Sequence, residues 1–260
     1  MQTMTYPQAD ADRSEALTKV PEVTLLFWIV KIAATTLGET GGDALSMSLN
    51  LGYLLSTGIF AALFIVAVAA QMRARQFHPW VYWTTIVATT TVGTTLADYF
   101  DRSLGIGYSG GTTILLVLLL TSLWTWQRTL GTVSVESVSS PKAEIFYWVT
   151  IMFSQTLGTA LGDWTADTAG LGYSGGALVF TGLLLLVVAA YRWTRISRTA
   201  LFWAAFVLTR PLGAVVGDYL DKPVAAGGLA LSRFGASAVL LGFIAACLFF
   251  FTHRASLKEH

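Results

Sequence analysis

The sequence predicts an all-α, polytopic membrane protein built from four tandem repeats, and three observations support this prediction. Only 12% of the 260 residues are charged and 54% are hydrophobic, whereas about 25% of residues are charged in a typical soluble domain. The apolar residues lie in eight segments, each close to the ~20 residues that a helix needs to cross a bilayer. A pattern of Trp, nine residues, Gly, four residues and Asp occurs four times, and a fixed spacing of this kind indicates an internal repeat.

Each repeat is expected to supply two transmembrane helices. The eight expected segments are residues 22–44, 50–70, 79–100, 107–126, 143–165, 172–191, 199–220 and 233–252. In every repeat a helix with polar residues precedes a short Gly-rich turn and a more apolar helix, so we expect a helical hairpin. Because each repeat holds two spans, all four start on the same side of the membrane. The repeats are therefore parallel, with pseudo-twofold or pseudo-fourfold symmetry, polar first helices inside and apolar second helices toward lipid.

The repeats divide the chain into two halves. The pattern in residues 28–43 recurs 120 residues later at 148–163, and that in 83–98 recurs at 203–218. We expect an N-terminal tail (1–20), a first membrane half (21–130), a polar linker (131–141), a second membrane half (142–253) and a C-terminal tail (254–260). The N-terminal residues lack the basic start and apolar stretch of a cleaved signal peptide, so the first membrane segment is expected to stay as an anchor.

The distribution of Lys and Arg predicts the orientation. With eight spans, eleven cationic residues fall on the side of both termini, and the other side holds only Arg102, Lys222 and Arg233. The positive-inside rule then places both termini in the cytoplasm. The repeat Trp residues lie toward the cytoplasmic ends of their helices, and we expect Trp28, Trp83, Trp148 and Trp203 to form an aromatic belt at the membrane interface.

The first helix of each repeat carries a stripe of polar residues. Positions 7, 11 and 15 after the Trp fall within about 60° of it on a helix with 3.6 residues per turn. Polar side chains in membrane helices face the bundle interior or a wet cavity, so four such stripes would line a path. The candidate lining and binding residues are Glu39, Asp43, Thr94, Asp98, Asp101, Gln155, Thr159, Asp163, Asp167, Arg210, Asp218 and Asp221.

Carboxylates that converge in this way suit a hard cation. Oxygen ligands without His or thiolate groups favour Mg, Ca or Mn over Zn or Cu, and we expect Asp43, Asp98, Asp163 and Asp218 to be the metal ligands. A structural reading stands beside this one: Gly is common where membrane helices pack closely, and an Asp at a helix end can cap the following turn. Glu39 and Arg210 have no counterparts in the other repeats, and we expect them to form an ion pair across the axis.

The chain resembles a group of bacterial membrane proteins defined by a tandem repeat of unknown function. The resemblance rests on KVPEVTLLFWIVK followed by TLGETGGD, and on the later GD-Y/W copies of the repeat. Repeat two departs from the pattern with Ala97, and repeat four lacks the Tyr-Ser-Gly-Gly turn. The resemblance supports the fold and the setting in a bacterial membrane and implies no activity.

The residues therefore lead to a transporter of the inner membrane as the first hypothesis. The expected substrate is a small cation, foremost a divalent metal such as Mn²⁺, exported with proton coupling, because neighbouring carboxylates share protons readily. The alternatives are a carrier or channel for an organic cation, suggested by Tyr99, Trp164 and Tyr219 beside the Asp residues, and a membrane scaffold or sensor. We expect no enzyme, because no nucleophile–base pair is visible. We also expect no resident cofactor and no nucleic-acid partner; the partners are the lipid bilayer, the cation and protons.

Overall fold

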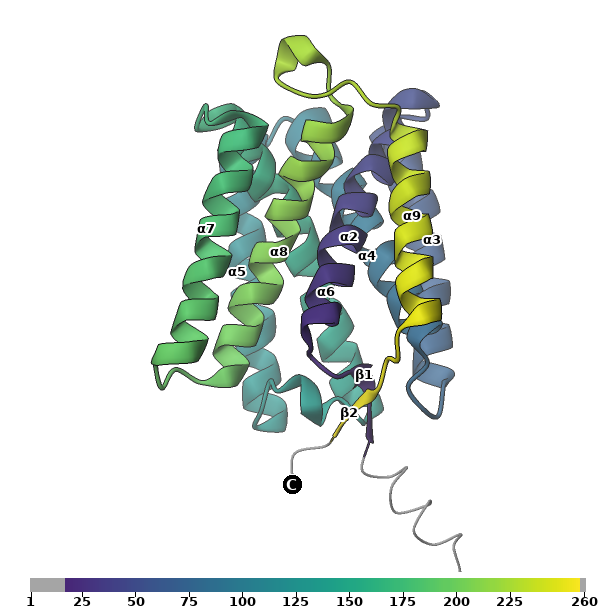
Figure 1. Cartoon of the computed structure of the whole chain (residues 1–260), viewed down its shortest axis with the longest axis vertical. Helices are drawn as coiled ribbons and strands as arrows, with labels where there is room; N and C mark the ends of the chain where they lie inside the picture. The colour runs from purple at the N-terminus through teal and green to yellow at the C-terminus, as the bar shows by residue number, and fades with distance from the viewer. Residues whose placement is uncertain (1–16, 258–260) are drawn as a thin grey trace, which may run out of the picture.

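Eight long α-helices run alongside one another and form the body of the protein (Figure 1). The computed structural model describes residues 17–257. The helices are α2 (Leu25–Asp43), α3 (Gly52–Arg73), α4 (Pro79–Asp98), α5 (Gly107–Leu130), α6 (Pro141–Asp163), α7 (Gly172–Trp193), α8 (Arg198–Asp221) and α9 (Arg233–Phe250). Their bounds agree with those of the eight helices expected from the sequence, and the largest shift is at the end of α5. By length and hydropathy, α3, α5, α7, α8 and α9 are suited to cross a membrane, which fits an all-α membrane fold.

Local sequence signals explain where the helices start and stop. The side chain of Thr24 accepts a hydrogen bond from the Phe27 amide and caps α2, and Ser140 caps α6 in the same way. Helices α2, α4 and α6 end at the motif Asp, and each continues directly into a π-helical turn of five residues. These turns are Ala44–Ser48, Tyr99–Ser103 and Trp164–Thr168. The fourth repeat lacks this turn, and α8 stays α-helical through Asp221.

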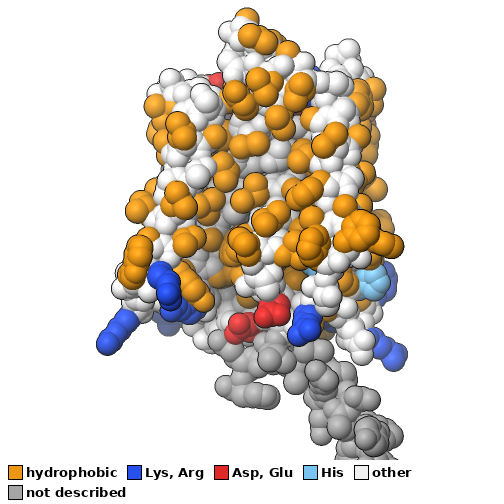
Figure 2. Space-filling view, viewed as in Figure 1, with side chains coloured by type: hydrophobic (Ala, Val, Ile, Leu, Met, Phe, Trp, Pro, Cys, Tyr) orange, Lys and Arg blue, Asp and Glu red, His pale blue; other side chains and the backbone are white. Residues whose placement is uncertain are grey.

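The first helices of the repeats form a closed inner ring. Helix α2 packs against α4, α4 against α6, α6 against α8, and α8 against α2. These helices hold nearly all buried residues of the bundle, whereas few residues of α3, α5, α7 and α9 are buried. The outer helices carry exposed apolar side chains such as Leu63, Val117 and Leu185. Figure 2 shows hydrophobic side chains over most of the face in view. The expectation of polar helices inside and apolar helices outside is confirmed.

Each outer helix packs against the inner helix of the following repeat. Helix α3 covers α4, α5 covers α6, α7 covers α8, and α9 returns to cover α2. The two helices of one repeat contact each other far less. They are consecutive in the chain, as the expected hairpin requires, but they do not pack against each other as a pair. Each inner helix uses its polar stripe and glycines on the neighbouring inner helices. The outer helix of the preceding repeat packs against the face that is left. The last repeat thereby closes the bundle on the first.

Glycines of the motif allow the inner helices to approach closely. A Cβ at three of the four motif glycines would collide with the residue seven positions after the Trp in the next repeat, and at Gly93 it would make a tight contact with that residue. The pairs are Gly38 with Thr90, Gly93 with Gln155, Gly158 with Arg210, and Gly213 with Thr35. A second small residue follows four positions later, and Gly217 lies against Glu39 in the same manner. The glycines therefore pack helix against helix, as small residues do in membrane bundles, which supports the structural reading of these positions.

Both termini of the described chain lie at one end of the bundle (Figure 1). Strand β1 (Leu17–Pro21) pairs antiparallel with β2 (Ala255–Leu257), although no strand was expected in either tail. Residues 1–16 and 258–260 of the predicted tails lie outside the described residues. The predicted linker is not free: Val135 and Val138 are buried beneath the bundle, and the indole of Trp203 donates to the Val133 carbonyl at 2.9 Å. Lys and Arg side chains gather at this end in Figure 2.

The predicted aromatic belt is wrong, because the repeat Trp residues form an internal layer. Trp83, Trp148 and Trp203 are buried and Trp28 is half-buried. Each Trp packs against the aromatic residue that precedes the Trp of the previous repeat. The ring-centroid distances are 5.5 Å for Phe27–Trp83, 5.9 Å for Tyr82–Trp148, 6.4 Å for Tyr147–Trp203 and 5.7 Å for Phe202–Trp28. These eight residues, here called the aromatic layer, close the ring at the end that bears the termini.

Candidate functional site

The polar stripes of the inner helices meet on one axis in successive layers. Next to the aromatic layer lies a buried layer of Lys31, Ile86, Ile151 and Phe206. The following layer, seven residues after each Trp, contains Thr35, Thr90, Gln155 and Arg210, all fully buried. The layer at position 11 contains Glu39, Thr94, Thr159 and Ala214, and the layer at position 15 contains the four motif Asp residues. The prediction that these stripes converge is supported by direct contacts, because Arg210 meets Glu39, Thr94 and Thr159 of the three other inner helices.

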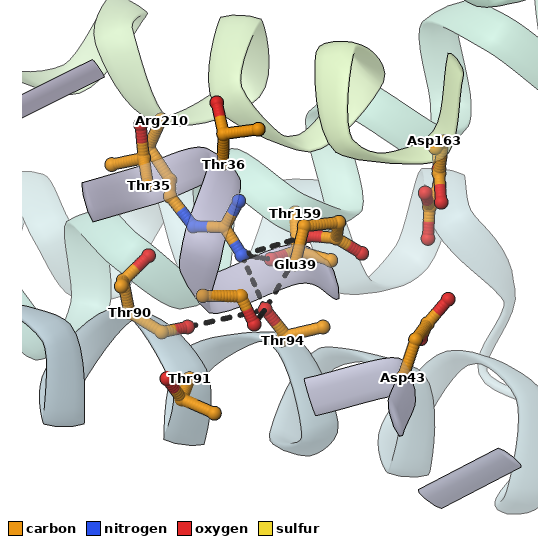
Figure 3. Close-up of polar contacts among 12 residues, drawn as sticks. Thr35, Thr36, Glu39, Asp43, Thr90, Thr91, Thr94, Thr159, Asp163 and Arg210 are labelled. Carbon is orange, nitrogen blue, oxygen red and sulfur yellow. Dashed lines mark hydrogen bonds and ion pairs between the residues drawn. The ribbon is translucent and has the colours of Figure 1, made fainter. Parts of the chain in front are cut away.

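Arg210 joins the inner helices at the centre of the bundle (Figure 3). One nitrogen of its guanidinium, Nη2, lies 3.0 Å from Glu39 Oε2 and donates to Thr94 Oγ1 at 2.6 Å and to the Thr159 hydroxyl. These acceptors belong to α2, α4 and α6, so one side chain of α8 reaches all three other inner helices. The predicted ion pair between Glu39 and Arg210 is confirmed. Both side chains are buried, so the pair is shielded from solvent.

The four motif Asp residues are buried, with 1–3% of their surface exposed. This burial excludes a hydrated cap at the outer helix end for these residues. Two cations bridge the four carboxylates in pairs. Arg102 lies 2.9 Å from Asp98 and 3.3 Å from Asp163. Lys222 lies 2.9 Å from Asp218 and also pairs with Asp43.

The two bridges are related by the repeat of the halves. Adding 120 to 98, 102 and 43 gives 218, 222 and 163, so each residue of one bridge has its counterpart in the other. In both, the cation binds the Asp four residues before it and the Asp of the following repeat. The carboxylate layer thus has twofold symmetry rather than fourfold symmetry.

One side of the layer is richer in carboxylate oxygens. Oxygens of Glu39, Asp43 and Asp218 lie within 4.8 Å of one another, and all three residues are buried. We call these three residues the carboxylate cluster. Asp43 Oδ1 is buried and has no hydrogen-bond partner among the described residues. Three acids this close repel one another unless cations or protons offset their charge, so the arrangement suits a bound cation.

The structure brings together most of the predicted site residues, with three exceptions. Asp167 is exposed at the outer end of the bundle and lies outside the carboxylate layer. Asp101 is buried, but its carboxylate lies against Gly111 of α5. Gln155 is on the axis, but its amide has no hydrogen-bond partner among the described residues. Asp221 does join the layer from the side, because Arg233 holds it at 2.8 Å and Lys222 lies 4.0 Å away.

Sequence reasoning missed Arg102 and Lys222, which were counted only as charges of the outer loops. A signal was present: both follow a motif Asp by four residues, and only the second and fourth repeats have a cation there. Residues four apart are neighbours on a helix surface. Lys31 was also not among the predicted site residues; its ammonium is fully buried 4.2 Å from the ring centre of Phe206, without a hydrogen-bond partner among the described residues.

Three ionisable groups next to the layer lie in the outer turns and have shifted pKa values. Burial alone lowers the pKa of Lys222, but the Asp218 and Asp43 carboxylates outweigh it and raise the pKa above its ordinary value. The same balance raises the pKa of Arg102, through Asp98 and Asp163. Both bridging groups therefore stay cationic at neutral pH. Burial raises the pKa of Asp101 to about 6, and Arg102 opposes this effect.

Comparison with known proteins identifies the repeat but no activity. The family model described as Repeat of Unknown Function (DUF347) matches residues 26–77, 81–132, 146–197 and 201–255. The four matches coincide with the four helix pairs, one inner and one outer helix each. No curated protein and no solved structure is similar enough to this chain to count as a match.

Proposed function

The chain belongs to the family defined by this repeat of unknown function, and we propose that it is a bacterial inner-membrane transporter for a small divalent cation such as Mn²⁺. The observation that carries the proposal is the carboxylate cluster: three buried carboxylates, within 4.8 Å of one another, on the axis of a closed ring of helices. Two oxygens that share one ion lie at most twice the metal–oxygen distance apart, about 4–5 Å for Mg²⁺ or Ca²⁺. The cluster therefore needs little or no closure to hold such an ion.

All eight helices cross the membrane in this proposal. Helices α2, α4 and α6 have 19, 20 and 23 residues, which corresponds to about 28–35 Å of helix and matches a hydrocarbon core of about 30 Å. They are less apolar than the outer helices because their polar stripes face one another rather than lipid. The Lys and Arg residues at the end with the termini support a cytoplasmic position for that end under the positive-inside rule.

The layers on the axis suggest how the transporter works. On the cytoplasmic side the aromatic layer and the pair of Glu39 and Arg210 close the path. On the other side the bridging cations are partly accessible, with 31% of the Arg102 side chain and 11% of the Lys222 side chain exposed. In the proposed mechanism this conformation is occluded, and the carboxylate layer is separated from the outer side only by the bridging cations. Export requires a second conformation in which the aromatic layer opens, and protons exchanged at the carboxylates supply the coupling.

An organic cation is favoured less by the surroundings of the layer. Trp164 is exposed, and Tyr99 and Tyr219 are half-buried. Recognition of an organic cation relies on aromatic faces that surround the ligand, and these three rings do not enclose the carboxylate layer. A scaffold or sensor would not require buried acids, which are costly within a membrane.

Metal-dependent thermal stabilisation of the purified protein tests the proposal. A ligand that binds only the folded state raises its melting temperature by mass action. We expect a rise with Mn²⁺ in the unaltered protein, its loss in Asp218→Asn and Asp43→Asn, and its retention in Asp167→Asn, the matched control outside the layer. An equal response of all four proteins, or no response to any divalent cation, would contradict the proposal.

A further inference from the structure

We propose that the ammonium of Lys222 is a tethered competitor of the transported cation, which occupies its site until the substrate displaces it. This inference rests on the proposed function. It names the group that occupies the cation site when no substrate ion is bound. In this view Asp43, Asp218 and Asp221 form the binding place that Lys222 and the metal ion share.

The position of the ammonium is that of a cation ligated by carboxylates. Lys222 Nζ pairs with Asp43 Oδ2, lies 2.9 Å from Asp218 Oδ1 and lies 4.0 Å from Asp221 Oδ1. The same Asp43 and Asp218 belong to the carboxylate cluster with Glu39. An ammonium is a compact point charge, so its place between carboxylates is one that an inorganic cation can take.

Charges around the site favour exchange with a divalent ion. The acids that face it are Glu39, Asp43, Asp218 and Asp221, and the other cations are Arg210 on Glu39 and Arg233 near Asp221 and Asp43. Four acids thus share three cationic side chains. If a divalent ion replaces the single charge of Lys222, the ion, Arg210 and Arg233 together carry four positive charges. These balance the four negative charges of the acids.

The chain around Lys222 lets the side chain leave without unfolding the backbone. The segment from Lys222 to Ser232 replaces the Gly-rich turn of the other repeats and stands above the bundle between α8 and α9 (Figure 1). Backbone hydrogen bonds from Leu229 to Tyr219 and from Ala230 to the Lys222 carbonyl, at 2.8 and 2.9 Å, hold its base. The four-carbon stem of Lys222 can therefore swing outward from a fixed Cα. The loss of the Tyr-Ser-Gly-Gly turn in repeat four thus accompanies a distinct role for its cation.

Arg102, the symmetry counterpart, is a fixed bridge. Its guanidinium uses Nε on Asp98 and Nη2 on Asp163, so one planar group joins two helices through two separate nitrogens. A guanidinium of this shape is not replaced by a small ion without moving both helices. Carboxylate oxygens that could hold a metal lie together on the Lys222 side of the layer and not, among the described residues, on the Arg102 side.

The test compares Lys222→Met with Arg102→Met in the full chain, using Mn²⁺ alone as the probe. Each variant removes one bridging cation and keeps much of the side chain's apolar volume. We expect both to melt below the unaltered protein in a chelator. Added Mn²⁺ should restore the melting temperature of Lys222→Met to that of the unaltered protein, with half-saturation at least tenfold below that of the unaltered protein. It should raise the melting temperature of Arg102→Met by no more than it raises that of the unaltered protein, so the deficit of this variant remains. Equal rescue of both variants, or rescue of neither, would overturn the tether.

A second variant covers the case in which Lys222→Met does not fold. Lys222→Arg keeps the charge and adds a fork that binds carboxylates at two points, so it should hold the site more firmly and raise the half-saturating Mn²⁺ concentration at least tenfold. An unchanged concentration contradicts the tether. If Asp218→Asn abolishes the stabilisation by Mn²⁺ but the Lys222 variants leave the half-saturating Mn²⁺ concentration unchanged, only the tether fails. If Mn²⁺ acts equally on the unaltered protein and Asp218→Asn, the proposed transport site fails with it.

Discussion

Arg210 and Glu39 form a buried ion pair of 3.0 Å although 171 positions separate them in the chain. The pair ties the last repeat to the first at the centre of the inner ring, and the hydroxyls of Thr94 and Thr159 complete the contacts of the same nitrogen. Two further guanidinium nitrogens, Nε and Nη1, have no partner among the described residues. The pair thus offsets the charge of one of the three acids in the carboxylate cluster.

Removal of one partner should cost more than removal of both. A buried charge left alone destabilises a protein by about 3–5 kcal/mol, whereas replacement of a whole pair is often nearly neutral. We expect Arg210→Met and Glu39→Gln each to lower stability by roughly this amount, and the double variant to be more stable than the sum of the two losses predicts. Unfolding in detergent, analysed as a double-mutant cycle, measures the coupling. Additive losses would mean that the two groups do not interact.

Close packing of the inner helices predicts the effect of a single methyl group. A Cβ at Gly213 would collide with the side chain and backbone of Thr35, whereas a Cβ at Gly182 on the outer helix α7 meets nothing within 4 Å. Gly213→Ala should therefore destabilise the protein by about 1–3 kcal/mol through overpacking. Gly182→Ala should be neutral or stabilise it by up to about 1 kcal/mol, because Ala is the better helix former. Melting temperatures of the two variants give the comparison, and equal values would contradict the packing.

A buried hydrogen bond stabilises the aromatic layer. The hydroxyls of Tyr82 and Tyr147 lie 2.6 Å apart, and both side chains are buried. Tyr82→Phe leaves the Tyr147 hydroxyl without its partner, which costs about 1–3 kcal/mol, while removal of both hydroxyls is nearly neutral. We expect the double variant to melt above Tyr82→Phe. The exposed Tyr191 provides the control, since Tyr191→Phe should leave the melting temperature unchanged.

Asp101 should make stability depend on pH. Its pKa is raised to about 6 by burial, above the unfolded value of about 3.9, so the folded state holds more protons than the unfolded state between these values. Stability then falls as pH rises through this window, and the charged form opposes folding at neutral pH. Asp101→Asn should melt above the unaltered protein at pH 7.5, and the difference should vanish below about pH 4. A difference that stays constant over this range would contradict the assignment.

Much of the fold could be predicted from the sequence because a membrane makes the relevant patterns simple. Apolar length sets the helices, and the spacing of Trp28, Gly38 and Asp43 with its three copies sets their register. Polar residues on one face of a membrane helix point toward the interior of the bundle. The sequence therefore predicted that the polar stripes of the four inner helices meet on one axis. The pair of Glu39 and Arg210 was predictable because neither charge has a counterpart at its position in the other repeats.

Other features depend on which helices become neighbours. The spacing of residues along the chain does not reveal which helices these are. The packing of α9 on α2 and the cyclic contact of Phe202 with Trp28 need the ring to be closed first. The aromatic belt was predicted because Trp at a helix end usually meets lipid headgroups. In this ring the ends of the inner helices meet one another instead. Arg102 and Lys222 resembled loop charges because their partners lie in another repeat.

Metal flux in proteoliposomes tests the central claim most directly. Vesicles that contain a fluorescent Mn²⁺ indicator would carry the unaltered protein, Asp218→Asn or Asp167→Asn, matched for the amount inserted. The account predicts rapid Mn²⁺ entry with the unaltered protein and with Asp167→Asn, and entry at the rate of empty vesicles with Asp218→Asn. Entry that is equal with the unaltered protein and Asp218→Asn, or absent with the unaltered protein, would contradict it.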